Sequence, residues 1–408
     1  MSPSRNRLWT IGGGKGGVGK SLLTASMGIA LARAGHSVIV VDANLAAPNL
    51  HAYFGIQAPS CTLLDVLDGH ASLADALVAT PEARMRCISC VGDDLGMADI
   101  APAMQLEMSG RLAGLETDFV LIDGGSGGSV SVLDWFNLAD EAIMVAPPDP
   151  AAMQCSYAFI KNAIFRRVQR KFEFHEEVTA ALLQMQDRTS IAKPRTMTDL
   201  LDSLRRTAPD TVDDVAAVVH SWHPIMIINM ATSEQDQRIA EIIQTAAKKF
   251  LEVEIQFYGS VSFDAIVRKA TQRTNLLDGS DPDSVPAQQM GQIALQLAGD
   301  RAQAPAAGLA GPPTQSATHG ATGLNDNLSV MGRELHVQTE DLGAESGGII
   351  TQVFCEGRVL LSTKTEYTQA LRDQDAGERL AESMRVQHYH VIREIETRKS
   401  KFDSVLAG

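Results

Sequence analysis

The sequence predicts an α/β protein with a doubly wound, mostly parallel sheet and helices on both of its faces, followed by a flexible linker and a small C-terminal α+β module. Apolar runs alternate with helical stretches from Leu8 to about Ala298, which is typical of repeated strand–helix units. A glycine-rich loop joins the first strand to the first helix. After residue 300 the composition changes to Ala, Gly, Pro, Ser and Thr. We therefore expect domains at 1–300 and 331–408, joined by a disordered linker at 301–330.

Composition limits the classes of partner. The chain has 408 residues, 45% of them hydrophobic, and a formal net charge of −14. This charge opposes general attraction to nucleic acid or to an anionic membrane, so either could bind only through a local basic patch. No apolar stretch has the length of a membrane span, and the N-terminus shows no signal-peptide core. We expect a cytoplasmic protein, with peripheral attachment to the inner membrane surface as a weaker alternative.

The glycine-rich loop carries the strongest motif. Residues 14–21 read Gly-Lys-Gly-Gly-Val-Gly-Lys-Ser and follow the apolar strand 8–11, which fits the phosphate-loop pattern G-x-x-x-x-G-K-[ST]. Lys20 is expected to reach the β- and γ-phosphates and Ser21 to ligate Mg²⁺, while a helix at 21–34 directs its positive end at the anion. ATP and Mg²⁺ are the expected cofactors, and the predicted contacts are Gly14, Gly16, Gly17, Val18, Gly19, Lys20, Ser21 and Leu22.

A second lysine in the loop, Lys15, has no task in an ordinary phosphate loop. The run Lys-Gly-Gly-Val-Gly-Lys-Ser at 15–21 resembles the deviant phosphate loop of the MinD/ParA ATPases, whose signature lysine reaches the nucleotide of a partner subunit. The resemblance implies an ATP-dependent homodimer in which Lys15, like Lys20, acts on the nucleotide. It also implies a spatial regulator that places division, flagellar, polar or cargo components.

The resemblance extends over about the first three hundred residues. The strand at 38–42 resembles the one that ends in the family's first switch, and 119–125 resembles the Walker B strand with the second switch. Residues 257–264 are similar to the family's late strand and nucleotide-side loop. The Phe54-Gly55-Ile56 stretch is most similar to the cell-division and flagellar-number branches of the family.

Several polar residues follow the predicted strands at their carboxyl ends, where ligands bind in such sheets. Asp123 is expected to hold a water of Mg²⁺, with capping of the next helix as the alternative. Asn229, after the strand at 225–229, resembles the family's adenine-reading asparagine, although it could equally close the strand.

The chain departs from the family at the first switch. The usual Asp-x-Asp is here Asp42-Ala43-Asn44, and an amide can orient a water but cannot accept its proton. We expect tight Mg-ATP binding with slow hydrolysis, in which Asn44 orients the water and Asp42 takes over part of the catalytic role. The alternative is that another residue holds the water.

Two further patterns have structural explanations that we prefer. Cys87 and Cys90 form a C-x-x-C pair, whereas related iron–sulfur carriers of the Mrp type have theirs near the C-terminus. In a strand-like stretch the two side chains point to opposite faces, and only a dimer could supply a second pair. The basic cluster Arg166, Arg167, Arg170 and Lys171 is expected to be a solvated helix face, with nucleic acid or lipid binding as the alternative.

The C-terminal module is expected to bind an unknown protein partner. Strands are predicted at 335–339, 349–354 and 358–362 and a helix at 379–401. The tail at 399–408 has little apolar bulk, so it gives only weak support to a membrane anchor. A positioning ATPase is the preferred function; a nucleotide-dependent scaffold or transcriptional partner with little hydrolysis is the alternative, and an iron–sulfur carrier ranks third.

Overall fold

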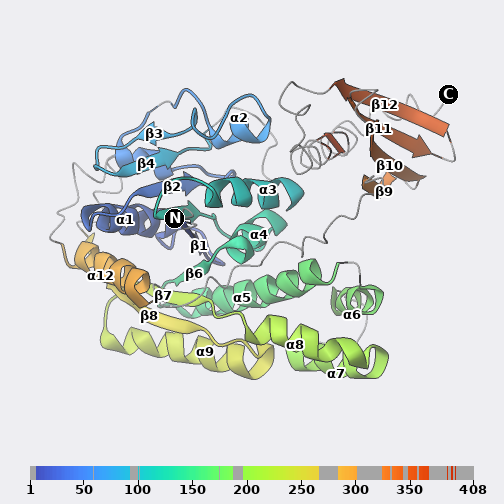
Figure 1. The fold of residues 1–408 in the computed structure, drawn as a ribbon. Helices are drawn as coiled ribbons and strands as arrows, with labels where there is room; N and C mark the ends of the chain where they lie inside the picture. The colour runs from blue at the N-terminus through green and yellow to red at the C-terminus, as the bar shows by residue number, and fades with distance from the viewer. Residues whose placement is uncertain are drawn as a thin grey trace. The chain divides into compact units, whose positions relative to one another are not determined.

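The computed structural model describes two units, formed by residues Met1–Ala310 and Gly311–Gly408 (Figure 1). The described residues are 6–57, 59–91, 100, 102–173, 175–186, 196–265, 284–300, 324–330, 333–342, 348–355, 358–366, 384, 387, 388 and 391. Most of the predicted linker and of the predicted C-terminal helix lies outside them.

The first unit is built on an eight-stranded sheet with the order β3-β4-β2-β5-β1-β6-β7-β8. Neighbouring strands are parallel except for β3, which is antiparallel to β4. The central strands are almost continuously apolar because helices cover both faces. The strands are β1 (Arg7–Gly12), β2 (Val38–Asp42), β3 (Val78–Ala79), β4 (Met85–Ile88), β5 (Phe119–Asp123), β6 (Glu141–Ala146), β7 (Ile225–Ala231) and β8 (Gln256–Ser262).

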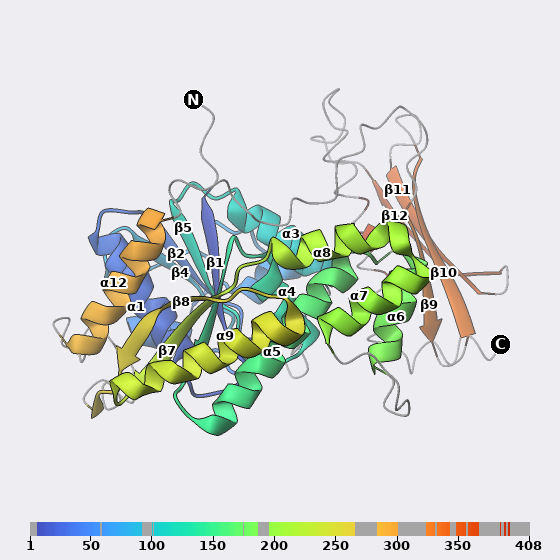
Figure 2. The same cartoon turned by 90° about the horizontal axis from the view of Figure 1, so that it is seen from below.

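Helices α1 and α12 share one core cluster with one face of the sheet. Two further clusters hold α2, α3, α4, α5 and α9 against the other face (Figure 2). This layering confirms the predicted doubly wound fold. The helices are α1 (Lys20–Arg33), α2 (Leu63–Leu67), α3 (Pro102–Ala113), α4 (Val130–Leu138), α5 (Pro150–Lys171), α6 (Glu176–Gln186), α7 (Met197–Thr207), α8 (Val212–His220), α9 (Arg238–Leu251) and α12 (Val285–Asp300), with 3-10 turns η1 (Leu50–Phe54), η2 (Pro209–Thr211) and η3 (Glu234–Gln237).

Between α5 and β7, the described residues form the helices α6, α7 and α8 and the turn η2. Thr196 and Asp199 form a capping box that starts α7. The apolar sides of α6, α7 and α8 join the cluster beneath α5 and α9. These helices therefore enlarge the main core and do not form a separate domain.

The second unit contains an antiparallel sheet in the order β12-β11-β10-β9. Its strands β10 (Arg333–Asp341), β11 (Gly348–Cys355) and β12 (Arg358–Glu366) confirm the three predicted ones. The fourth, β9 (Leu324–Val330), occupies part of the predicted linker, so that part of the linker assignment is wrong. Three buried polar side chains of this unit contact one another: Thr339 Oγ1 lies 2.6 Å from Thr351 Oγ1 and 2.8 Å from the Nδ1 atom of His388.

Candidate nucleotide site

The glycine-rich loop connects β1 to α1 at the carboxyl edge of the sheet. Gly17 and Gly19 have φ angles of 74° and 90°, which favour glycine. The loop is also too tightly enclosed for side chains: a Cβ on Gly14 would stand 2.2 Å from the carbonyl oxygen of Cys155 in α5. The backbone therefore lies where only glycine fits, with its N–H groups available to an anion.

Lys20 and Asn229 are both buried beside this loop. Lys20 Nζ donates a hydrogen bond to the carbonyl oxygen of Lys15 at 3.1 Å, and burial lowers the pKa of Lys20 while Asp123 opposes that shift. Asn229 Nδ2 donates to the carbonyl oxygen of Val18 at 2.8 Å. Asn229 thus braces the loop from the end of β7, and its reading of adenine stays a prediction.

Asp123 ends β5 with its side chain buried. Its Oδ1 accepts a hydrogen bond from Gly125 N–H at 3.3 Å, and its buried Oδ2 is without a hydrogen-bond partner among the described residues. Burial raises the pKa of Asp123, and the neighbouring Ser21 side chain lowers it. An open carboxylate oxygen close to a hydroxyl fits the oxygen ligands of Mg²⁺. Bound there, Mg²⁺ would neutralise phosphate charge.

Lys15 lies at the outer edge of the loop. Its Nζ is 3.1 Å from Asp149 Oδ2, and the two side chains are 44% and 42% exposed. Asp149 also begins α5, because its other carboxylate oxygen accepts the backbone N–H of Ala152 at 2.8 Å. Within a single chain, Lys15 therefore makes an exposed ion pair with Asp149, the N-cap residue of α5.

Asp42 is fully buried at the end of β2, and its carboxylate organises the first switch. It accepts backbone N–H groups from Asn44 at 3.1 Å and from Asn49 and Leu50 at 2.9 Å each. Burial, followed by the charge of Asp123, raises the pKa of Asp42 to about 7. Both carboxylate oxygens of Asp42 thus accept backbone N–H groups that shape the turn after β2, and its catalytic role stays a prediction.

Asn44 bridges the two switches. Its Nδ2 donates to the carbonyl oxygen of Ala47 at 2.9 Å. Its Oδ1 lies 2.9 Å from the place where a Cβ on Gly125 would stand. A carboxylate at position 44 would set an oxygen against the Ala47 carbonyl, so the amide has a structural use that an aspartate does not share.

The paired cysteines occupy different faces of the sheet, as predicted. Cys87 belongs to the cluster beneath α1, and Cys90 belongs to the cluster on the opposite face. Within the described part of the chain, no group of three or more His, Cys, Asp or Glu side chains is arranged to hold a metal ion. The geometry of this pair therefore fits core packing.

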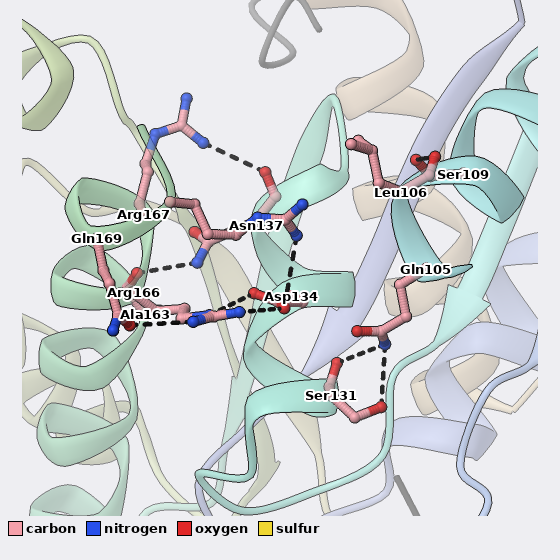
Figure 3. A network of polar contacts seen from close by, with 11 residues as sticks. Gln105, Leu106, Ser109, Ser131, Asp134, Asn137, Ala163, Arg166, Arg167 and Gln169 are labelled. Carbon is pink, nitrogen blue, oxygen red and sulfur yellow. Dashed lines mark hydrogen bonds and ion pairs between the residues drawn. The ribbon is translucent and has the colours of Figure 1, made fainter. Parts of the chain in front are cut away.

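The basic cluster on α5 is not a solvated face, and that prediction is wrong for its three arginines (Figure 3). Arg166 binds the fully buried Asp134 of α4 through two hydrogen bonds of 2.8 Å, and Arg170 Nη1 lies 3.5 Å from the same carboxylate. Arg167 donates to the carbonyl oxygen of Asn137 at the end of α4. The cluster joins α5 to α4, which explains why these charges can be buried.

Sequence reasoning missed Asp149 and Asp134. The Asp149-Pro150 dipeptide before a helical stretch is an N-terminal signal that could have marked a cap. Nothing local marks Asp149 as the partner of Lys15, which lies 134 positions away. Asp134 is likewise 32 positions from Arg166, so only the packing of α4 on α5 reveals the pair.

Comparison with known proteins places this geometry in a family. The family model for the CobQ/CobB/MinD/ParA nucleotide binding domain matches residues 9–277. Antiactivator FleN of Pseudomonas aeruginosa is 24% identical over 275 residues, covering 67% of this chain and 79% of FleN. The flagellum site-determining protein YlxH of Helicobacter pylori is 30% identical over 152 residues, covering 36% of this chain and 50% of YlxH.

Among solved structures, the septum site-determining protein MinD of Pyrococcus horikoshii, complexed with Mg-ADP, is 22% identical with a TM-score of 0.48. It covers 73% of this chain and 99% of that one. The family match spans the glycine-rich loop, the ends of β2 and β5 and the strand that carries Asn229. This chain belongs to the CobQ/CobB/MinD/ParA family of nucleotide-binding domains.

Proposed function

We propose that this chain is a MinD/ParA-like ATPase that binds Mg-ATP, dimerises on it and acts as a positioning regulator with slow intrinsic hydrolysis. Its glycine loop, buried Lys20 and open Asp123 oxygen support Mg-ATP binding. Relatives named as flagellum and septum site-determining proteins support the positioning role. The MinC:MinD complex of Aquifex aeolicus is a solved assembly of a relative with a protein partner.

The observation that carries dimerisation is the exposed position of Lys15. Both members of the Lys15–Asp149 pair are more than two-fifths exposed, and exposed ion pairs add little stability. Opening this pair therefore costs little, and the four-carbon side chain of Lys15 is then free for a negative charge outside its own chain. The phosphates of a second protomer's nucleotide are such a charge.

Light scattering with Mg²⁺ and a non-hydrolysable ATP analogue tests this proposal. Wild-type chain is expected to double its mass, and Lys15→Gln to stay monomeric while it retains analogue binding through Lys20. Lys248→Gln is the control, because Lys248 also makes an exposed ion pair, with Glu254 and away from the loop. Wild-type chain that remains monomeric at high concentration, or a control that also fails to dimerise, would contradict the role of Lys15.

A second candidate function is a nucleotide-dependent scaffold or transcriptional partner with little hydrolysis. Asn44 favours it, since no proton-accepting carboxylate stands at that position. Turnover measured alone and with lipid vesicles, DNA or partner extract separates the two. Stimulated turnover supports the positioning ATPase, and turnover that stays at the background of Lys20→Ala under every condition supports the scaffold.

The second unit is proposed to bind the partner protein. None of the helices in the described ranges is long and apolar enough to cross a membrane. A chain that ends at residue 310 is expected to bind ATP as the full-length chain does. It is expected not to bind the protein partner that the full-length chain binds. Loss of ATP binding in the shortened chain would show that the second unit stabilises the first.

A further inference from the structure

We propose that Ser126, together with Asn44, positions the water that attacks ATP. The inference rests on the proposed function. Ser126 lies in the second switch, where the sequence reads Asp123-Gly-Gly-Ser-Gly-Gly-Ser129. Its hydroxyl is thus the only side-chain group that the loop offers between Asp123 and Ser129, the N-cap of α4.

On the two sides of Ser126, the backbone of this loop is fastened to β1 and to Gly13, the residue that leads from β1 into the phosphate loop. Gly124 N–H donates to the carbonyl oxygen of Ile11 at 2.9 Å, and Gly127 N–H donates to that of Gly13 at 3.0 Å. Between these two bonds, Ser126 Oγ reaches over the phosphate loop, 3.7 Å from the place where a Cβ on Gly16 would stand. The hydroxyl therefore faces the backbone that is expected to hold the phosphates.

Asn44 approaches the same loop from the first switch. The bond from its Nδ2 to Ala47 fixes the direction of the amide, and Oδ1 lies against Gly125, the residue before Ser126. The two nearby carboxylates have other tasks, because backbone N–H groups occupy Asp42 and Asp123 belongs to the Mg²⁺ site. The two neutral groups proposed to hold the water are therefore the amide oxygen of Asn44 and the exposed hydroxyl of Ser126.

These groups can orient a water but cannot take its proton. In the reaction, the water oxygen forms a bond to the γ-phosphorus while the bond from that phosphorus to the β–γ bridging oxygen breaks. ADP keeps the bonding electron pair, and the proton of the water passes to an oxygen of the departing phosphate. Phosphoryl transfer depends chiefly on positioning and charge stabilisation, so a neutral pair suffices for slow turnover.

The experiment uses full-length chain and measures two quantities separately: the affinity for a fluorescent ATP analogue and the single-turnover rate of ATP hydrolysis. Ser126→Ala is expected to lower the rate roughly 10-fold, less than the about 10²–10³-fold that a lost hydrogen-bond donor costs in more enclosed sites, with affinity within about twofold. Ser126→Thr keeps the hydroxyl and is expected to restore most of the rate.

Ser129→Ala is the matched control, since Ser129 belongs to the same loop but its hydroxyl accepts Val132 N–H at 3.4 Å as the cap of α4. Its rate is expected to stay near wild type. Asn44→Ala alone and combined with Ser126→Ala completes a double-mutant cycle, in which the two losses are expected to be less than additive because both groups hold one water.

Three results would overturn the role of Ser126: an unchanged rate in Ser126→Ala, an equal loss in Ser129→Ala, or a fall in nucleotide affinity that accounts for the whole effect. Wild-type chain that binds the analogue but does not hydrolyse ATP would also overturn the role of Ser126, and it would leave the proposal of ATP binding intact. Wild-type chain that fails to bind the analogue would instead refute the proposed function itself.

Discussion

Replacing Asp134 by asparagine is expected to destabilise the first unit by about 3 kcal/mol. The side chain is fully buried and accepts two 2.8 Å bonds from Arg166, while Arg170 lies at 3.5 Å. Asparagine keeps the size, but it removes the charge and turns an NH₂ group toward an arginine. Breaking a buried ion pair costs about 3–5 kcal/mol. The lower end applies here because Arg166 and Arg170 are 16% and 15% exposed, so water reaches them.

Urea unfolding followed by tryptophan fluorescence measures this loss in full-length chain. Trp9, Trp135 and Trp222 are all buried in the first unit, so the signal reports on that unit alone. Asp202→Asn is the control, because Asp202 pairs with Arg205 on the surface, where both side chains are more than half exposed. The control is expected to change stability by no more than about 0.5 kcal/mol. An Asp134→Asn transition that coincides with the control would refute the view that this pair holds α4 to α5.

Three further changes probe the nucleotide site. Asp149→Asn keeps an N-cap but releases Lys15, so analogue-driven dimerisation in light scattering should strengthen a few-fold; weaker dimerisation would mean that Asp149 assists the dimer. Asn229→Ala removes the bond to Val18 and should lower ATP affinity about 3–10-fold in equilibrium titration, and unchanged affinity would show that the loop needs no brace. Because the native pKa of Asp42 is about 7, above its unfolded value, the unfolded state binds fewer protons and stability should fall as pH rises from about 4 through 7. Asp42→Asn should flatten that slope in unfolding titrations, and a slope identical to wild type would contradict the shift.

The sequence predicted what short-range patterns encode. Strand–helix alternation and the loop at 14–21 were sufficient for the layered sheet and for the place of Lys20 and Asp123, because strand ends, glycine conformations and helix starts are local properties. The backbone contacts of Asp42 were not predicted, since its partners are N–H groups whose direction depends on how residues 44–50 turn. The arginines of α5 were misjudged because their charge is neutralised by Asp134, on another helix.

The joining of α4 to α5 also has a mechanical consequence. Both helices begin at the nucleotide edge: α4 follows the second switch, and α5 starts at Asp149, which holds Lys15. Arg166 and Arg170, far along α5, fix it to the middle of α4. The ion pairs of Asp134 therefore couple the loop before α4 to the Asp149–Lys15 pair at the start of α5. Under the proposed function, a partner that displaced the distant end of α5 would act on the lifetime of the dimer and on the rate of ATP hydrolysis at the same time.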